Sequence, residues 1–257
     1  MLHYTTHSQG DPIYLLHGWA LNSHVWDCVL PGLAQHGKII AIDLPGHGKS
    51  ALPDNGNYDL DAITNEVAQL FDAGATVVGW SLGGLVALNL ACKYPELVHK
   101  LVLVAGSPRF VRSPDWPNAV EKSVIDGFAQ SLVSDYRATI LRFLAIQALG
   151  SDQAKQSIKA LREKVFINGE PQLIALQEGL NLLSETDLRP ALPDIRCPSL
   201  VVVGEKDTLI PANSGSDTSK LLANSQLAII GGAGHAPFIS HSEEFLSIVT
   251  EFINEKA

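Results

Sequence analysis

The sequence is poor in cysteine. Only three of its 257 residues are cysteines, namely Cys28, Cys92 and Cys197, which are widely separated and set in apolar surroundings. No two of them have the close spacing of a zinc-binding pair, and an odd number does not suit a disulfide framework. We therefore expect no metal site and three buried free thiols in a reducing compartment.

The sequence also lacks an excess of positive charge and a long apolar run. Its 18 Lys and Arg against 27 Asp and Glu give a formal charge of −9, which argues against a nucleic-acid partner because phosphates are neutralised by basic side chains. No run reaches the roughly 18 apolar residues of a membrane span, and residues 1–19 do not resemble a secretion signal. We expect a soluble, cytoplasmic protein that is not bound to a membrane.

Short apolar runs, in contrast, recur along the chain. Each is followed by Gly or Pro and then by a helical pattern; the six runs are IYLLHG, KIIAIDLPG, ATVVGWS, KLVLVAGSP, PSLVVVGEKD and LAIIGGAGH. Nearly continuous apolar strands are typical of a parallel sheet that is buried on both faces by helices. The length suits one large core, so we predict an α/β fold with a mostly parallel sheet.

This alternation stops between residues 115 and 186, where no run resembles a strand. Apolar residues recur there at spacings of three and four, which predicts helices, with Pro117 and Ser151 as helix starts and Gly150 as a stop. We therefore expect a helical lid inserted between two strands of the sheet. The predicted division is a core of residues 1–110 and 187–257 and a lid of residues 111–186.

Three polar residues directly follow apolar runs, at the edge of a parallel sheet where ligands bind. They are Ser81, Asp207 and His235. Ser81 lies in a G-x-S-x-G sequence, which is typical of a strained strand-to-helix turn where glycines two residues away avoid a collision. We predict Ser81 as the nucleophile, His235 as the base that takes its proton, and Asp207 as the carboxylate that holds the imidazole.

The tetrahedral intermediate of such a reaction needs N–H donors for its oxyanion. Leu82, the residue after the nucleophile, provides one predicted donor. The second is expected from the loop after the first long strand, where Trp19 follows His17 and Gly18. The sequence therefore predicts an oxyanion hole formed by Trp19 and Leu82.

Other residues compete for these roles. Glu205 and Asp43 also follow strands, but the chain order of such triads favours Asp207, and Asp43 suits a turn. We interpret His241 as the start of a helix. We interpret His17 as a structural residue that packs under the oxyanion loop. We expect the remaining histidines at the surface: His3, His7, His24, His36, His47 and His99.

Several segments together resemble one family more specifically than G-x-S-x-G does. The segments LLHGWALNSHVW, DLPGHGKS, GWSLGGLVA, RFLAIQALG and GHAPFISH are similar to the pimeloyl-[acyl-carrier protein] methyl ester carboxylesterase family of biotin synthesis, in the α/β-hydrolase superfamily. The resemblance implies an α/β-hydrolase fold and a Ser81, Asp207 and His235 triad. It also implies substrate contacts, at positions Trp19, Ser81, Leu82, Phe143, Leu144, Ala145, Ile146, Gln147 and His235.

The resemblance further implies that acyl carrier protein, which is acidic, docks on basic lid residues. Arg142, Lys155 and Lys159 match the family's positions, and Arg137 and Arg162 lie nearby. Residues 109–164 carry a net charge of +3 and the rest of the chain −12, so an acidic partner would be steered to the lid. One departure is Ala138, where the family pattern suggests arginine.

We therefore predict a cofactor-independent, monomeric serine carboxylesterase that hydrolyses the methyl ester of pimeloyl-acyl carrier protein. Trp19 and Trp80 could line its acyl pocket or belong to the core. The apolar lid residues could instead serve packing, and the basic lid residues could instead form a solvated helix face. A general short-chain carboxylesterase or a carbon–carbon bond hydrolase of the same fold is the alternative, because specificity lies in the lid. A signalling protein that uses the pocket as a receptor is the alternative of another class.

Overall fold

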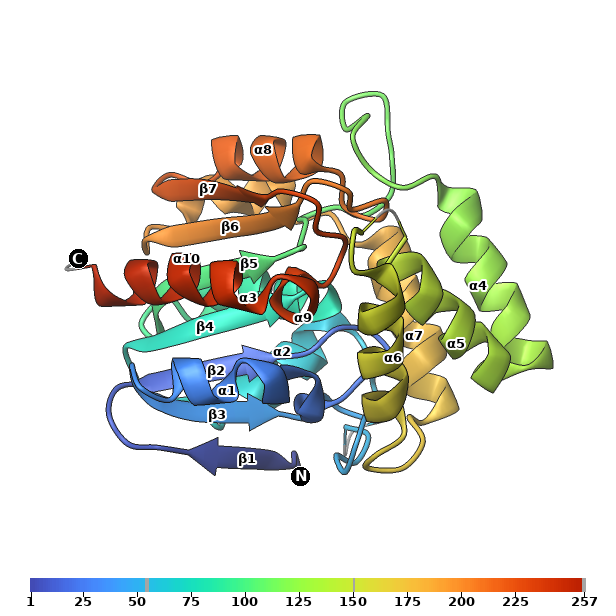
Figure 1. Cartoon of the computed structure of the whole chain (residues 1–257), viewed down its shortest axis with the longest axis horizontal. Coiled ribbons are helices and arrows are strands. Elements are labelled where there is room, and N and C mark those ends of the chain that lie inside the picture. The colour runs from blue at the N-terminus through green and yellow to red at the C-terminus, as the bar shows by residue number, and fades with distance from the viewer. Residues whose placement is uncertain (54–55, 150, 256–257) are drawn as a thin grey trace.

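The computed structural model describes residues 1–53, 56–149 and 151–255. A single seven-stranded sheet runs through the core in the order β1-β3-β2-β4-β5-β6-β7 (Figure 1). The strands are β1 (Tyr4–His7), β2 (Pro12–Leu16), β3 (Lys38–Ile42), β4 (Ala75–Trp80), β5 (Val98–Val104), β6 (Ser199–Gly204) and β7 (Ser225–Ile230). All neighbours pair in parallel except β1 and β3, which confirms the mostly parallel sheet.

Each of the six apolar runs forms one strand, and the seventh strand was not predicted. Strand β1 has the sequence YTTH, without an apolar run, and most of it is exposed. It lies at the edge of the sheet, where it pairs antiparallel with β3. Because an edge strand of this kind buries little, its sequence carries no burial pattern to read.

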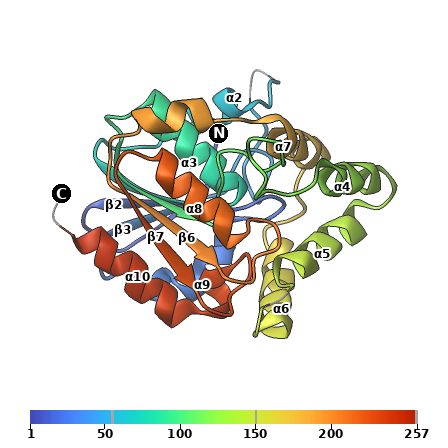
Figure 2. The same ribbon diagram turned by 90° about the horizontal axis from the view of Figure 1, so that it is seen from above.

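Helices cover both faces of the sheet. One face carries α2 (Leu60–Ala68), α3 (Leu82–Lys93) and α8 (Ala212–Leu221), and the other carries α1 (Leu30–Leu33) and α10 (Ser242–Asn254) (Figure 2). Shorter helical segments are η1 (Ser23–Cys28), η2 (Arg189–Asp194) and α9 (Pro237–Ser240). The central strands are therefore buried on both sides, as in β4, where every residue is buried.

Four helices between β5 and β6 lie beyond the carboxyl ends of the parallel strands (Figure 1). They are α4 (Lys122–Ser134), α5 (Tyr136–Gln147), α6 (Ala154–Val165) and α7 (Leu173–Glu185). We call this group the lid helices. The insertion is therefore helical and lies between two strands, as predicted, while the predicted domain boundaries stay a prediction.

Two predicted helix starts in the lid are wrong. Helix α4 begins at Lys122 rather than at Pro117, because Val120 N donates to Phe110 O at 2.9 Å and holds this stretch in an extended pairing. Helix α6 begins at Ala154 rather than at Ser151. Ser151 instead begins a turn, in which its backbone carbonyl accepts from Ala154 N at 3.1 Å. Gly150, the predicted helix stop, lies outside the described residues.

The chain enters and leaves the lid at one place. Arg109 Nη1 donates to Asp187 Oδ2 at 2.7 Å, and Leu188 N donates to Pro108 O at 2.9 Å. Hydrogen bonds from Arg189 and Arg109 hold the pKa of Asp187 well below its usual range. These contacts join the two ends of the insertion to each other.

The three cysteines are unpaired, but the prediction that all are buried is wrong. Cys28 is exposed, and Cys92 and Cys197 are half-buried. Their apolar neighbours in sequence lie inside the core while the cysteines lie at its margin.

Within the described residues, none of the helices combines the length and hydropathy needed to span a bilayer.

Candidate active site

Ser81 lies in the sharp turn between β4 and α3. Its backbone has φ 55° and ψ −115°, a region that non-glycine residues rarely adopt and that marks stored strain. A Cβ at Gly79 would lie 2.4 Å from Gly83 O, and a Cβ at Gly83 would lie 2.4 Å from Leu16 O. The strand and helix therefore approach too closely for any side chain at these two positions, as the G-x-S-x-G pattern predicts.

We expect Gly83→Ala to destabilise the protein, because the added methyl group meets backbone atoms of β2 that cannot rotate away. Overpacking of this kind costs about 1–3 kcal/mol. Thermal or urea unfolding measures the loss. Gly127→Ala is the matched control, since a Cβ there meets nothing within 4 Å, and replacing a helical glycine should add about 1 kcal/mol. Equal stability of the two variants would contradict the close packing of the turn.

His235 and Asp207 form a buried pair. His235 Nδ1 and Asp207 Oδ2 are 2.8 Å apart, and their side chains are 1% and 0% exposed. The second carboxylate oxygen of Asp207 accepts from Leu209 N at 2.8 Å and from Ile210 N at 2.9 Å. Asp207 is therefore fixed by its own loop and orients the imidazole through the remaining oxygen.

The His235 backbone is held from two sides. Its N–H donates to Gln147 O at the end of α5 at 2.9 Å, and its carbonyl accepts from Trp80 Nε1 at 2.8 Å. Because Trp80 directly precedes Ser81, this bond brings the histidine loop to the serine turn. His235 Nε2 is buried without a hydrogen-bond partner among the described residues, and the Ser81 side chain makes no capping bond to α3.

The competing residues have other partners. Glu205 Oε2 accepts from Gly232 N at 3.0 Å, so this carboxylate supports the histidine loop from outside. Asp43 accepts from the backbone N–H groups of Ser23 and Lys49 at 2.7 and 3.0 Å, as suits the predicted turn. His241 occupies the N-cap position of α10, without a side-chain bond to the helix, and so lies at a helix start as predicted.

Leu82 and Trp19 carry the two backbone amides predicted to bind the oxyanion. Leu82 is the first residue of α3, so its N–H has no acceptor within the helix. Trp19 N–H takes part in none of the backbone hydrogen bonds of the described loops. The oxyanion hole at Trp19 and Leu82 stays a prediction, in which the Leu82 donor would lie at a helix N-terminus, where partial positive charge gathers.

The lid helices lie directly on this site. The Trp19 ring packs edge-on against Phe143 of α5, with ring centroids 4.7 Å apart, and Trp19 Nε1 donates to Leu176 O of α7 at 2.9 Å. Leu144 is buried, and Ala145 and Ile146 are half-buried.

Gln147 stands apart from its neighbours on α5. The residue is 1% exposed, and neither polar atom of its side-chain amide has a partner among the described residues. A buried amide without hydrogen bonds is costly, so this group is available to a polar atom of a substrate.

Sequence reasoning missed the supporting contacts of three residues. Trp80 holds His235 through its indole N–H, and Leu176 holds Trp19 from α7. His47, predicted at the surface, is instead fully buried beside His17, with ring centroids 5.3 Å apart. The glycines on both sides of His47, in DLPGHGKS, are the one sequence signal of its enclosed position.

The basic residues of the lid are exposed. Lys155, Lys159 and Arg162 lie at spacings of four and three on α6 and line one shallow groove of about 300 Å³. Arg137 pairs with Glu170, and Arg142 donates to Ser131 Oγ at 2.6 Å.

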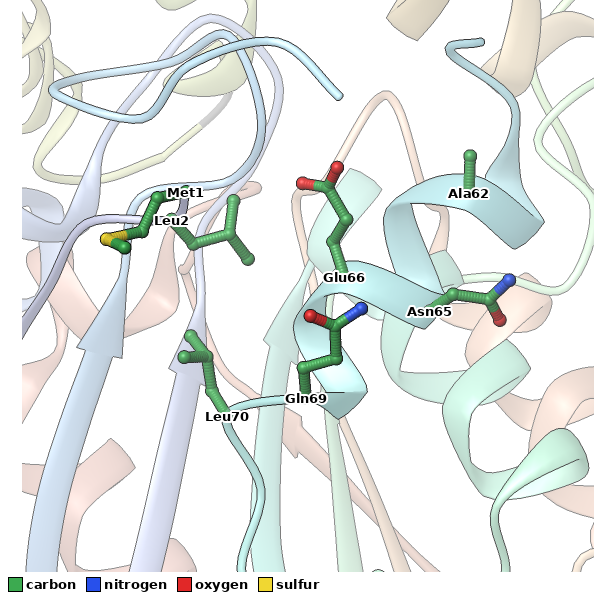
Figure 3. A pocket seen from close by; sticks show the side chains of 7 residues that line it. All are labelled: Met1, Leu2, Ala62, Asn65, Glu66, Gln69 and Leu70. Atoms are coloured by element: carbon green, nitrogen blue, oxygen red, sulfur yellow. The ribbon is translucent and has the colours of Figure 1, made fainter. Parts of the chain in front are cut away.

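A cavity of about 350 Å³ lies away from this site, between residues 1–2 and α2 (Figure 3). Of the described residues that line it, Glu66 has the one titratable side chain, and none belongs to the candidate site. Among the described residues, no three His, Cys, Asp or Glu side chains are grouped as metal ligands.

The sheet order, the serine turn and the buried acid–imidazole pair define the chain as an α/β hydrolase. A family profile described as "alpha/beta hydrolase fold" matches residues 11–242. A pimeloyl-[acyl-carrier protein] methyl ester esterase of Aeromonas hydrophila is 42% identical over 95% of this chain and 96% of its own length. One of Xanthomonas campestris is 41% identical over 98% of both chains. The chain belongs to this family of esterases within the α/β hydrolases.

Solved structures agree on the fold. A bromoperoxidase from Bacillus anthracis is 26% identical, with a TM-score of 0.89 over 99% of this chain and 95% of its own. An esterase from Exiguobacterium antarcticum has a TM-score of 0.87 at 23% identity, covering 99% of this chain and 96% of its own. These neighbours have different activities, so the fold alone does not identify the substrate.

Proposed function

We propose that this chain is a serine carboxylesterase that hydrolyses the methyl ester of pimeloyl-acyl carrier protein. The observation that carries the proposal is the 41–42% identity to esterases of that name over at least 95% of the chain. Such coverage includes the lid helices. Because substrate choice in this fold depends on the lid, similarity there supports the same substrate class.

The reaction follows from the groups around Ser81. Ser81 Oγ attacks the ester carbonyl while His235 Nε2 takes its proton, and Asp207 stabilises the imidazolium that forms. The amides of Trp19 and Leu82 bind the oxyanion. His235 then gives the proton to departing methanol, and a water molecule activated by the same nitrogen releases the carboxylate from the acyl-enzyme.

The acyl chain would enter between the lid helices and the core. Ser81 is 2% exposed, and the Trp19 ring is covered by Phe143 and by α7. The lid must therefore move before an ester reaches the serine. Apolar Phe143, Leu144 and Ile146 suit the methylene chain, and the unpaired amide of Gln147 suits a polar atom of the ester.

We also propose that the carrier docks on α6 of the lid, next to this entrance. Lys155, Lys159 and Arg162 face one groove there, and the acidic body of the enzyme would repel the carrier elsewhere. A cytoplasmic, monomeric enzyme fits this role and stays a prediction.

Hydrolysis of defined esters tests the proposed function. We expect methanol release from pimeloyl-acyl carrier protein methyl ester at a higher kcat/KM than from free monomethyl pimelate. Turnover of short free esters with no preference for the carrier would support the general carboxylesterase. Cleavage of carbon–carbon bonds in vinylogous diketones would support the alternative hydrolase. A single slow turnover would support a receptor.

Charge reversal on the lid tests the docking site. We expect Lys159→Glu combined with Arg162→Glu to raise KM for the carrier-bound ester about tenfold, because both exposed charges would then repel the carrier. The effect should shrink at high salt. The activity on a free short ester should not change.

Lys220→Glu is the matched control for these variants. Lys220 is also an exposed lysine, 69% by side chain, but it lies on α8, outside the lid. An equal effect of Lys220→Glu, or an equal loss with the free ester, would contradict carrier docking on α6.

A further inference from the structure

Two buried histidines hold the loop that carries the proposed oxyanion donor Trp19. His17 and His47 are both fully buried, and the proposed mechanism uses neither as acid or base. Each places one ring nitrogen on a peptide group beside Trp19. We infer that His17 and His47 are positioning residues that, in their neutral form, aim the Trp19 N–H at the oxyanion. This inference rests on the proposed ester hydrolysis.

The first contact fixes the peptide that contains the donor. His17 Nδ1 donates to Gly18 O at 2.8 Å. The carbonyl of Gly18 and the N–H of Trp19 belong to one planar trans peptide and point in opposite directions. Holding the carbonyl in place therefore sets the direction of the N–H.

The second contact fixes the next peptide. Ala20 N donates to His47 Nε2 at 3.3 Å. Ala20 has φ 65°, an uncommon value for alanine that persists only when the surroundings impose it. The two peptide planes that flank the Trp19 Cα are thus each held by one imidazole.

Both rings are anchored to the loop after β3. Leu44 N donates to His17 Nε2 at 2.9 Å, and His47 Nδ1 donates to Pro45 O at 3.0 Å. In each ring Nδ1 faces a carbonyl and must carry the proton, whereas Nε2 faces an N–H and must be bare. A protonated ring would turn its Nε2 hydrogen toward an N–H, so only the neutral form makes both contacts.

The surroundings keep both rings neutral. Burial lowers the pKa of His17, and burial together with His17 lowers the pKa of His47 to about 3. The bonds to Gly18 O and Pro45 O and the charge of Asp43 act in the opposite direction and raise these pKa values. Asp43 also contacts His3 Nδ1 at 3.0 Å. Since both folded pKa values lie below the ordinary 6.5, the unfolded state binds more protons below that pH. Stability from these histidines therefore falls as the pH drops from 6.5 toward 3.

Paired substitutions at each histidine separate positioning from packing. The amide nitrogen of an asparagine can take the place of the histidine Nδ1, and the amide oxygen of a glutamine can take the place of Nε2. At position 17 the critical contact is made by Nδ1, so His17→Asn should keep kcat within about tenfold of the wild type, while His17→Gln loses about 100-fold. At position 47 the critical contact is made by Nε2, so His47→Gln should be active and His47→Asn impaired. KM for a short p-nitrophenyl ester should change little in all four.

A trifluoromethyl ketone provides a second readout, since it forms a tetrahedral oxyanion on the serine. Its affinity should fall in parallel with kcat in His17→Gln and His47→Asn. Acid unfolding of His47→Gln should also shift to lower pH than that of the wild type. His99→Leu, at an exposed histidine, is the control and should resemble the wild type.

The opposite outcome is equally clear. Equal kcat for Asn and Gln at each position, in variants that fold by circular dichroism, would overturn the positioning role while leaving the ester hydrolysis of the wild type intact. If the Ser81→Ala variant hydrolyses esters as fast as the wild type, the proposed function is wrong and the inference is wrong with it.

Discussion

Ser81→Ala should abolish ester hydrolysis while leaving the protein folded. The oxyanion amides and the His235–Asp207 pair stay in place, but no hydroxyl remains to form the acyl-enzyme, and kcat should fall by roughly 10⁶-fold. Alanine is no more strained than serine at φ 55°, so the unfolding temperature should change little. Release of p-nitrophenol from a short ester and labelling by a fluorophosphonate both measure the loss.

Ser214→Ala is the matched control for this prediction. Ser214 is also fully buried, but it lies on α8 and its hydroxyl lies 3.4 Å from that of Ser107. We expect normal activity and normal labelling from it. Turnover by Ser81→Ala within tenfold of the wild type would remove Ser81 as the nucleophile and with it the proposed mechanism.

Asp207→Asn has the second-largest expected effect. The amide oxygen can still accept from Leu209 and Ile210, as Oδ1 does now, so the loop should keep its shape. The amide nitrogen, however, would donate to His235 Nδ1 and leave the ring proton on Nε2, the nitrogen that must be bare in the proposed mechanism. The wrong tautomer cannot take the serine proton, and kcat should fall by about 10⁴-fold.

Steady-state kinetics of Asp207→Asn should show this loss in kcat with little change in KM. Glu205→Gln is the control, because Glu205 is also a carboxylate after β6 but its side chain is half exposed and bonds to Gly232. It should keep nearly full activity. A larger loss from Glu205→Gln than from Asp207→Asn would make Glu205 the acid of the site.

The strands, the serine turn and the acid–base candidates could be predicted because each leaves a local signature. Buried parallel strands are continuous apolar runs, and a strand-to-helix turn as tight as that at Ser81 requires glycine on both sides. Asp207 could be preferred over Glu205 because Glu205 lies closer to the end of the apolar run, and in the structure Asp207 is the carboxylate that contacts His235.

Other features left no such signature. Strand β1 is a mostly exposed edge without an apolar run, and the start of α4 is displaced by a pairing with Phe110 twelve residues upstream. Apart from its two flanking glycines, His47 has no local signal of burial, because its burial depends on contact with the loop around Ala20, 27 residues earlier in the chain. None of these contacts is encoded in the residues next to the position concerned.

By itself the sequence determined the strands, the serine turn and the candidate side chains at the strand ends, because composition and periodicity reflect local burial and turn geometry. Only the tertiary structure decided how these groups are held. The indole of Trp80 on the histidine loop, α7 over Trp19 and two neutral imidazoles around the oxyanion loop join segments far apart in the chain. The physical reason is that a hydrogen bond requires a direction as well as a residue type, and direction is fixed only when the whole chain has packed.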